Sequence, residues 1–284
     1  MKILITIPHF HDANPGSKYG SGYMTRIQRA GILEATLLGL FDLYLGASGL
    51  IDWRGGDSPS LLGANLDASV SIDVVIVTVP ERHVLGCLDP LIVARVQHAV
   101  APIDQPKLLG FVARDLLGRS QGYDWYGYME DDTLLVDRWM FHKLAQATPR
   151  PEVVVLPNRF EIDPARPNRK VYTDGPFFFD GTPDFARLVL GTGSFERQVG
   201  GVPARFRQVR NAHSGCFFLS AEQMAIFAAS DGFREVTGKY VGPLESAATL
   251  GLLRTFEVHK PDRANADILE VRHLGGTVLK RLGL

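Results

Sequence analysis

The sequence contains few of the residues that would place it in a special structural class. Only two of its 284 residues are cysteines, Cys87 and Cys216, and they lie far apart without a CxxC or Cys/His spacing. A disulfide framework and a structural zinc site are both disfavoured, because each needs several ligating or pairing residues at short intervals. We therefore expect the protein to occupy a reducing compartment.

Long apolar segments are also lacking. No stretch approaches the roughly 18 uninterrupted apolar residues of a membrane-spanning helix. The first residues, MKILITIPHFHD, carry one lysine and an apolar run that ends at Pro8, too early for a signal peptide. We expect a cytoplasmic protein with no integral membrane segment.

Neither sign of charge dominates the chain. Lys and Arg number 30 against 31 Asp and Glu, which gives a formal net charge of -1. No field of the whole molecule would attract nucleic acid or an anionic membrane, so we expect no nucleic acid partner. With 45% hydrophobic residues the chain can bury a large core.

The first half of the chain alternates between strand and helix patterns. Strands are predicted for the apolar, β-branched runs 2–7, 72–80 and 123–129. Helices are predicted for 25–40, with Thr25 as N-cap, and for 108–120. This order indicates an α/β protein with a parallel sheet, in which ligands bind beyond the carboxyl ends of the strands.

The second half has less regular patterns. Strands are predicted at 153–157, 216–220 and near the C-terminus, with helices at 221–230 and 242–254. We expect residues 46–69, rich in Gly, Ser, Asp and Asn, to form a loop with at most a short helix. Little periodicity is seen in 158–212, and ten Lys or Arg lie among seven Asp or Glu in 150–210. This Arg-rich region is either an exposed loop, a binding surface for an anionic acceptor, or a lid that closes over a ligand.

An acidic triplet follows the third predicted strand. Glu130, Asp131 and Asp132 have no basic residue between them, so their mutual repulsion must be offset. On an extended backbone Glu130 and Asp132 would point to the same side, where they could hold a hard divalent cation. Alternatively, the triplet only caps a helix over 133–147, since acids at a helix N-terminus contribute about 0.3–1 kcal/mol.

The order of these motifs resembles that of the GT-A fold glycosyltransferases. The helix RDLLGRSQG, the strand YDWYGYM and the triplet EDD, followed by TLLVDRWM, resemble the nucleotide-sugar half of that family. HSGCFFLSAEQM, GPLESAAT and EVRHLGG resemble its later, acceptor-side motifs. The resemblance implies one catalytic domain over 1–284, with a donor half (1–135) and an acceptor half (136–284), and a mostly parallel Rossmann-like central sheet with flanking helices.

The resemblance also implies a metal and its ligands. Asp132 would bind Mn²⁺ or Mg²⁺ at the diphosphate of the donor, and Glu130 would reach the ribose or assist the metal. The family more often has Asp at the first position, so Glu130 departs from its pattern. His273 would be a further metal ligand, with His259 as its substitute and His213 as a weaker candidate; otherwise each histidine is a packed core residue.

Other residues would contact the donor nucleotide, with a UDP-sugar as the expected donor. By the resemblance, the turn at Pro8, His9 and Phe10 would lie against the base, and Asp131 would belong to the same cofactor site. Glu81 and Arg82 stand where many members carry an Asp that reads the base. Arg26 and Arg114 could contact phosphate or sugar bidentately, or simply form surface salt bridges.

The reaction implied is hexosyltransferase-like transfer of a sugar to a saccharide or other hydroxyl acceptor. An inverting enzyme needs a carboxylate to deprotonate that hydroxyl, and Glu245 matches the acidic position of the family. In a retaining enzyme Glu245 would instead position the donor sugar. It could also be an ordinary first-turn acid of a helix that follows Gly242 and Pro243.

Three alternatives stay open. A nucleotidyltransferase would share the sheet and the acid–metal site, but its compact Gly-rich loop with Arg and Lys is not present after the first strand. A non-catalytic nucleotide- or carbohydrate-binding protein of the same fold is also compatible with the sequence. A two-lobed GT-B enzyme fits a chain of this length poorly. No GxxxxGK[ST] loop is present, which removes the usual kinase.

Overall fold

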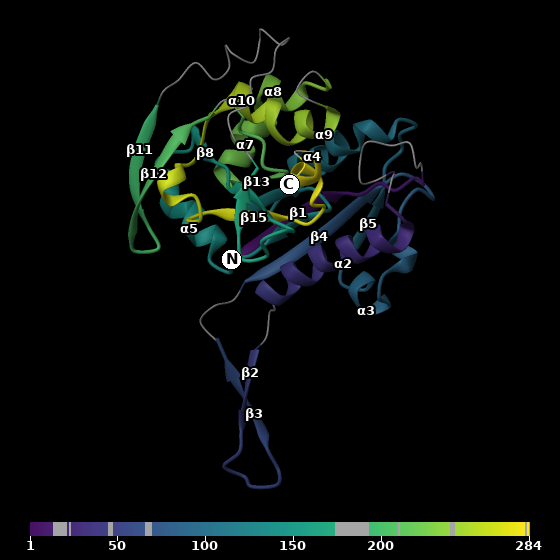
Figure 1. The fold of residues 1–284 in the computed structure, drawn as a ribbon, viewed down its shortest axis with the longest axis vertical. Coiled ribbons are helices and arrows are strands. Elements are labelled where there is room, and N and C mark those ends of the chain that lie inside the picture. Colours follow the sequence, from purple (N-terminus) through teal and green to yellow (C-terminus); the bar gives the residue numbers. More distant parts are fainter. Residues whose placement is uncertain are drawn as a thin grey trace.

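The computed structural model describes residues 1–13, 22, 24–44, 48–65, 70–173, 193–209, 211–238, 242–281 and 283. A central sheet is covered by helices on both faces, and two smaller sheets lie beside it (Figure 1). The predicted fold class, α/β with a mostly parallel central sheet and flanking helices, is confirmed.

The central sheet has the order β13-β6-β1-β4-β5. Its strands are β1 (Lys2–Pro8), β4 (Ser71–Thr78), β5 (Gln97–Val100), β6 (Trp125–Met129) and β13 (Cys216–Ser220). The first four run parallel, and β13 pairs antiparallel with β6. The carboxyl ends of β1 and β6 therefore meet at one edge, which is where the acidic triplet begins.

The two faces of this sheet bury different helices. Along β1 the odd residues Ile3, Ile5 and Ile7 pack in the core with α2 (Arg26–Leu43) and α5 (Met140–Ala147). On the opposite face Leu4 belongs to the core with α4 (Leu109–Arg119), α7 (Ala221–Ala229) and α10 (Gly251–Thr255). The period-2 alternation of a strand buried on both sides accounts for this division.

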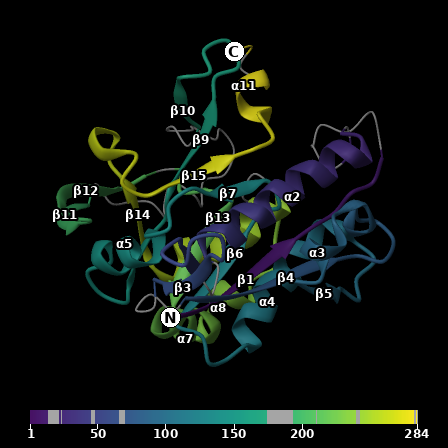
Figure 2. The same cartoon turned by 90° about the horizontal axis from the view of Figure 1, so that it is seen from below.

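The predicted helix after the first loop is α2, and its start is well defined. Thr25 is the N-cap: its hydroxyl accepts from the backbone N–H of Gln28, whose side chain accepts from the N–H of Thr25. This capping box satisfies two amides that the helix cannot pair itself. The helix then crosses the face of the central sheet (Figure 2), and none of the described helices is long and apolar enough to cross a membrane.

The remaining helical segments are short. They are α3 (Pro90–Val93), α8 (Asp231–Arg234), α9 (Pro243–Glu245), a π-helical stretch at Ser246–Leu250, and α11 (Thr277–Arg281), with 3₁₀ turns at Leu85–Cys87, Pro106–Leu108 and Arg263–Asn265. The helix predicted over 242–254 is thus three short pieces, α9, the π-helical stretch and α10, and a proline begins it.

Where the structure describes it, most of the Arg-rich region 158–212 is strand, so the alternative of an exposed loop is wrong for those residues. It forms β9 (Asn158–Ile162), β10 (Lys170–Tyr172), β11 (Ser194–Val199) and β12 (Val202–Gln208). These strands join β7 (Thr133–Leu135), β8 (Val153–Val155), β14 (Glu257–Pro261) and β15 (Glu270–His273) in two sheets, β10-β9-β15-β7 and β11-β12-β14-β8. β10, β11 and β12 are largely exposed, so they lack the apolar pattern of a buried strand. Residues 174–192 and 210 lie outside the described residues.

The second expected loop, 46–69, is also wrong where the structure describes it. β2 (Ser48–Asp52) and β3 (Ser60–Ala64) form an antiparallel hairpin. The hairpin projects from the body of the molecule (Figure 1). The Gly, Ser and Asp residues of this segment favour a loop in the sequence. The backbone pairing of β2 with β3 makes it a hairpin instead.

Candidate functional site

The acidic triplet lies just beyond the carboxyl end of β6, at the edge of the sheet where β1 also ends. Here the backbone turns: the N–H of Thr133 donates to the carbonyl of Glu130 at 3.1 Å. The segment that follows is the strand β7, and α5 begins only at Met140. The alternative in which the triplet caps a helix over 133–147 is therefore wrong, and so is the extended backbone expected between Glu130 and Asp132.

Asp131 points into the protein and is bound there by two partners. Its carboxylate forms an ion pair with the guanidinium of Arg29, a side chain of α2 that is only 4% exposed. It also lies 2.5 Å from Nδ1 of His9, which is buried after β1. Because Nε2 of His9 accepts from the N–H of Val84 at 3.2 Å, the proton resides on Nδ1 and is donated to Asp131.

Asp132 points towards the C-terminal strand. Its Oδ2 lies 3.6 Å from Nε2 of His273 on β15 and 3.4 Å from Nη1 of Arg29. Burial by itself raises the pKa of Asp132, but the cations of His273 and Arg29 outweigh it and hold the pKa well below its usual range. Its other oxygen, Oδ1, is buried and has no hydrogen-bond partner.

A second carboxylate contacts the other nitrogen of the His273 ring. Its Nδ1 lies 2.6 Å from Oε1 of Glu161 on β9. Glu161 in turn accepts from the backbone N–H groups of Val278 and Leu279 in α11, at 3.1 and 2.9 Å, and α11 lies beside β9 (Figure 2). Burial lowers the pKa of His273, but the carboxylates of Asp132 and Glu161 outweigh it and raise the pKa to about 9.

Glu130 points in a third direction. Its carboxylate lies 3.8 Å from Nη1 of Arg159 and 3.6 Å from Nε2 of His213. Burial and the neighbouring Asp132 raise the pKa of Glu130 to about 8, against the opposing charge of Arg159. Gly215, at φ +67°, leaves room for it, because a Cβ there would come within 2.8 Å of Oε2 of Glu130. The repulsion of the triplet is thus relieved because the three acids point in different directions, Glu130 towards Arg159, Asp131 towards Arg29, and Asp132 towards His273 and the same Arg29.

The arrangement fits a divalent cation that is shared with a bound substrate. Asp132 offers the unpartnered Oδ1, and a histidine whose Nδ1 donates to a carboxylate is the usual form of a metal-ligating imidazole. Among the described residues, no group of three or more His, Cys, Asp or Glu is placed to hold a metal ion alone. Two protein ligands suffice for Mg²⁺ or Mn²⁺ where substrate phosphates complete the coordination.

The predicted acid Glu245 lies near this site. It is the last residue of α9, half-buried, and its charge contributes to the raised pKa values of Glu130 and of the buried Tyr128. Of the predicted histidines, His213 is brought to Glu130, whereas His259 packs against the ring of Phe195 at 4.9 Å. The weaker of the two substitute candidates is therefore the one that reaches the triplet.

The residues predicted to contact the nucleotide differ in how exposed they are. Pro8 and His9 are buried, and the half-buried ring of Phe10 lies 4.9 Å from the guanidinium of Arg82. Arg26 begins α2 and donates to the carbonyl of His83 at 3.2 Å. The Arg26 side chain is exposed, and this hydrogen bond places it beside the segment that follows β4.

Arg114 is not brought to the acidic triplet. Its side chain is 1% exposed and its Nη2 donates to the carbonyl oxygens of Phe233 and Glu235 beneath α8. Burial lowers its pKa, because the nearby acidic groups only partly compensate. In this position Arg114 fixes α8 against α4, which is at variance with the expected phosphate contact.

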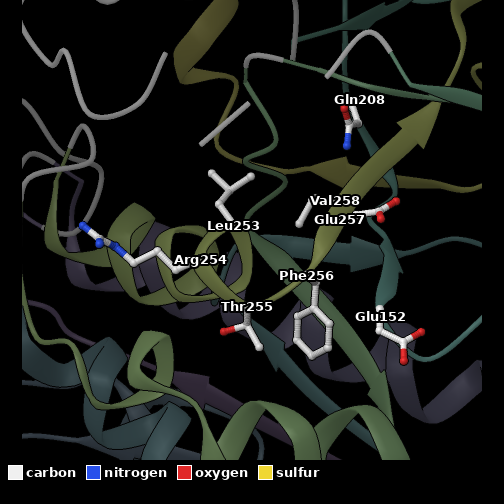
Figure 3. Close-up of a pocket in the computed structure, with 8 residues that line it drawn as sticks. All are labelled: Glu152, Gln208, Leu253, Arg254, Thr255, Phe256, Glu257 and Val258. Atoms are coloured by element: carbon white, nitrogen blue, oxygen red, sulfur yellow. The ribbon is translucent and has the colours of Figure 1, made fainter. Parts of the chain in front are cut away.

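A cavity of about 350 Å³ lies elsewhere (Figure 3). It is lined by Glu152, Gln208, Leu253, Arg254, Thr255, Phe256, Glu257 and Val258. β8 and β14 begin at this cavity and run away from it. Since ligands of such sheets bind beyond the carboxyl ends of strands, and none of the triplet's partners lines the cavity, we place the candidate site at the triplet.

Three of its residues were missed by the sequence analysis: Arg29, Arg159 and Glu161. Arg29 had a usable signal, because it stands four residues before Leu33 and so on the apolar face of a predicted helix. A charge there requires a buried partner of opposite sign. Arg159 and Glu161 gave no such signal, since their strand was not predicted.

No family model and no curated protein matches the sequence. Solved structures with similar backbones include galactosyltransferase LgtC in complex with donor and acceptor sugar analogs, at 9% identity and a TM-score of 0.38 over 92% of this chain and 73% of that one. A 4-diphosphocytidyl-2C-methyl-D-erythritol synthase has 12% identity and a TM-score of 0.36, over 99% and 97%. A CMP:2-keto-3-deoxy-manno-octonic acid synthetase complexed with CTP has 11% identity and a TM-score of 0.41, over 100% of both chains.

The similar structures thus include a GT-A glycosyltransferase, as the sequence resemblance implied, together with two nucleotide-handling synthetases. At these identities and scores we draw no function from the likeness.

Proposed function

We propose that this protein is a metal-dependent glycosyltransferase that moves a sugar from a nucleotide diphosphate donor, with a UDP-sugar as the first candidate, to a hydroxyl acceptor. The observation that carries the proposal is the pair formed by Asp132 and His273. Asp132 keeps its buried Oδ1 without a partner, and His273 turns Nε2 towards the other oxygen of the same carboxylate, Oδ2, at 3.6 Å, while Glu161 binds Nδ1. These two residues would hold Mn²⁺ or Mg²⁺, which when bound would neutralise the departing diphosphate.

In the reaction the bond between the anomeric carbon and the diphosphate oxygen breaks, and a bond to the acceptor oxygen forms. The nucleoside diphosphate departs with the electron pair of the broken bond, and the proton of the acceptor hydroxyl passes to a carboxylate. Glu245 is our candidate for this base, because it is half-buried on α9 and electrostatically close to Glu130. This assignment applies to an inverting enzyme.

The remaining residues position the donor and the metal ligands. Arg29 and His9 fix Asp131, which anchors the turn that carries Asp132. Glu130, whose pKa is raised to about 8 and which is therefore largely protonated near neutral pH, can hydrogen-bond a ribose hydroxyl as donor or acceptor. Phe10, half-buried after β1, is the predicted base contact that offers a ring face.

Titration calorimetry of UDP, GDP and CMP, each with Mn²⁺ and with EDTA, tests the proposal. We expect one diphosphate to bind only with metal, and Asp132→Asn to abolish this binding. Asp42→Asn is the matched control, since it makes the same change on the exposed side of α2 and should bind as the wild type does. Absence of nucleotide binding under every condition would sink the proposal.

Analysis of the products distinguishes the proposed glycosyltransferase from the nearest alternative, a nucleotidyltransferase. A glycosyltransferase, or its slow hydrolysis of the donor, releases a nucleoside diphosphate. A nucleotidyltransferase consumes a nucleoside triphosphate and releases pyrophosphate. Incubation with UDP-sugars and, separately, with CTP or UTP together with a sugar phosphate as nucleotidyl acceptor, followed by chromatography of the nucleotides, therefore decides between the two classes.

A further inference from the structure

His213 borders the acidic triplet and has no role in the proposed reaction. It is 6% exposed and lies in the segment 212–215, which precedes β13. Its backbone N–H donates to Oδ1 of Asn211 at 3.3 Å, and its carbonyl oxygen accepts from Nζ of Lys260 at 3.2 Å. The main chain of His213 is therefore held at both its donor and its acceptor.

Lys260 anchors the same segment at a second point. Its Nζ donates to Oγ of Ser214 at 2.7 Å, and that hydroxyl donates to the carbonyl oxygen of Pro157 at 2.7 Å. The side chains of Lys260 and Ser214 lie in residues that are 1% exposed. Burial of an amine and a hydroxyl is costly unless both are hydrogen-bonded. These contacts, made from β14 and from the residue before β9, therefore fix the path of the segment.

The imidazole ring of His213 is anchored by a helix of rare geometry. Its Nδ1 lies 3.0 Å from Oγ1 of Thr249, in the π-helical stretch Ser246–Leu250. All five residues of this stretch are buried. π-helical turns are uncommon in proteins and are frequently found at functional sites. The stretch directly follows Glu245, so the candidate base and the anchor of His213 belong to one run of helix.

With its main chain and Nδ1 held, His213 presents Nε2 to Glu130. Nε2 lies 3.6 Å from Oε1 of Glu130. This separation is longer than a hydrogen bond, but such contacts are often long before a substrate binds and shorten in the complex. Burial and the charges of Arg159 and Lys260 lower the pKa of His213 well below its usual range. The ring is therefore neutral, and it offers Glu130 a direction rather than a second positive charge.

The segment also shapes the space around the carboxyl group of Glu130. The backbone N–H of Glu130 donates to the carbonyl oxygen of Gly215 at 2.7 Å. A Cβ at Gly215 would come within 2.8 Å of Oε2 of Glu130 and 3.0 Å of Oγ1 of Thr133. That hydroxyl is buried and has no hydrogen-bond partner among the described residues. A buried hydroxyl without a partner, beside a carboxyl group, is completed by a ligand that carries a hydroxyl of its own.

We propose that His213, anchored by Thr249, is a positioning residue that directs the carboxyl group of Glu130 to a hydroxyl of the donor ribose, so that the site selects ribonucleotides over deoxyribonucleotides. This inference rests on the proposed function and assigns Glu130 to the ribose rather than to the metal. A site built to hydrogen-bond a hydroxyl rejects the analogue that lacks it, because its own polar group is then left unpaired.

Calorimetric titration of UDP, GDP and CMP in Mn²⁺, each beside its 2′-deoxy and 3′-deoxy analogues, tests the inference. We expect the wild type to bind at least one deoxy analogue roughly 10–100-fold more weakly than the ribonucleotide. His213→Ala should reduce this ratio of affinities to about one, since Glu130 is no longer directed to the ribose.

The anchor is tested in the same way. Thr249→Val removes the hydroxyl at nearly constant shape and should also reduce the ratio, whereas Thr249→Ser keeps the hydroxyl and should preserve it. A purely structural role of Thr249 would not separate these two variants by ribose selectivity. The matched controls are His142→Ala, an exposed position on α5, and Thr148→Val, a half-buried position at its end, and both should keep the wild-type ratio.

Circular dichroism verifies that each variant is folded, and titration of Mn²⁺ alone verifies that its metal affinity equals that of the wild type. A wild type that binds a ribonucleotide and both deoxy analogues equally overturns the inference. So does a ratio that is unchanged in His213→Ala. Absence of binding by all three ribonucleotides instead contradicts the proposed function, and this inference falls with it.

Discussion

At the scale of single residues, Glu161 acts on the proposed metal only through His273. Its carboxylate fixes the ring by accepting from Nδ1, so that Nε2 faces Asp132. We predict that Glu161→Gln weakens Mn²⁺ binding by roughly 10–100-fold, the usual cost of removing such a supporting carboxylate. Calorimetric titration of Mn²⁺ measures the effect.

The control for that variant is Glu196→Gln, which changes an exposed acid paired with Arg205 on β12 and should leave Mn²⁺ affinity unchanged. His273→Ala should lose more affinity than Glu161→Gln, because it removes the ligand itself. Equal Mn²⁺ affinity in wild type and Glu161→Gln would show that the carboxylate serves only to hold α11.

At the scale of elements, the close contact of β6 with its neighbours depends on Gly127. A Cβ at this position would come within 2.4 Å of Ile5 on β1 and 2.8 Å of Phe218 on β13. We predict that Gly127→Ala lowers the free energy of unfolding by about 1–3 kcal/mol, the range for overpacking a core. Denaturant unfolding followed by fluorescence measures the change.

Gly31 provides the opposite case. It lies inside α2, and a Cβ there meets nothing within 4 Å. Gly31→Ala should raise the free energy of unfolding by about 0.5–1 kcal/mol, because alanine loses less backbone entropy in a helix. If Gly127→Ala lowers the free energy of unfolding and Gly31→Ala raises it, the loss at Gly127 is due to the contacts that a Cβ would make there. It is then not a general effect of replacing glycine.

The elements also differ in how well the sequence predicted them. β1, β4 and α2 were predicted nearly to their ends, because apolar periodicity and a capping residue are local signals. β2, β3 and β10 to β12 were missed, because exposed or one-sided strands are selected by their pairing partners. β9 is buried but was also missed, because its sequence NRFEI places polar and charged residues where an apolar run would be expected. A strand such as β11, with five of six residues at least partly exposed, has no apolar period to detect.

At the scale of the whole molecule, stability should depend on pH through the triplet's partners. His273, with a pKa raised to about 9, and Glu130, with a pKa raised to about 8, both bind a proton more tightly when folded. Their contributions are complete below the unfolded values, about 6.5 and 4.3. They are lost as the pH rises through the folded values. The metal-free protein should therefore lose stability between pH 6.5 and pH 9.

We expect that loss to be on the order of 1–3 kcal/mol, as one or two groups release protons. Urea unfolding in EDTA across this range measures it, and His273→Gln should flatten the upper part of the profile. Asp132 acts in the opposite sense, since its depressed pKa favours the folded state above its unfolded value and matters only in acid. A free energy of unfolding that is constant from pH 6.5 to 9 contradicts the prediction.

The sequence by itself determined the α/β class, the central strands and the place of the acidic turn, because these follow from hydrophobic period and from the order of elements. The resemblance of its motifs to a known family also named His273 and Glu245 as candidate site residues. The tertiary structure alone decided which way each acid points. Asp131 is anchored by Arg29, 102 residues away, and His273 by Glu161, 112 residues away. Contacts at such separations depend on how sheets and helices assemble, and no local pattern of residues encodes them.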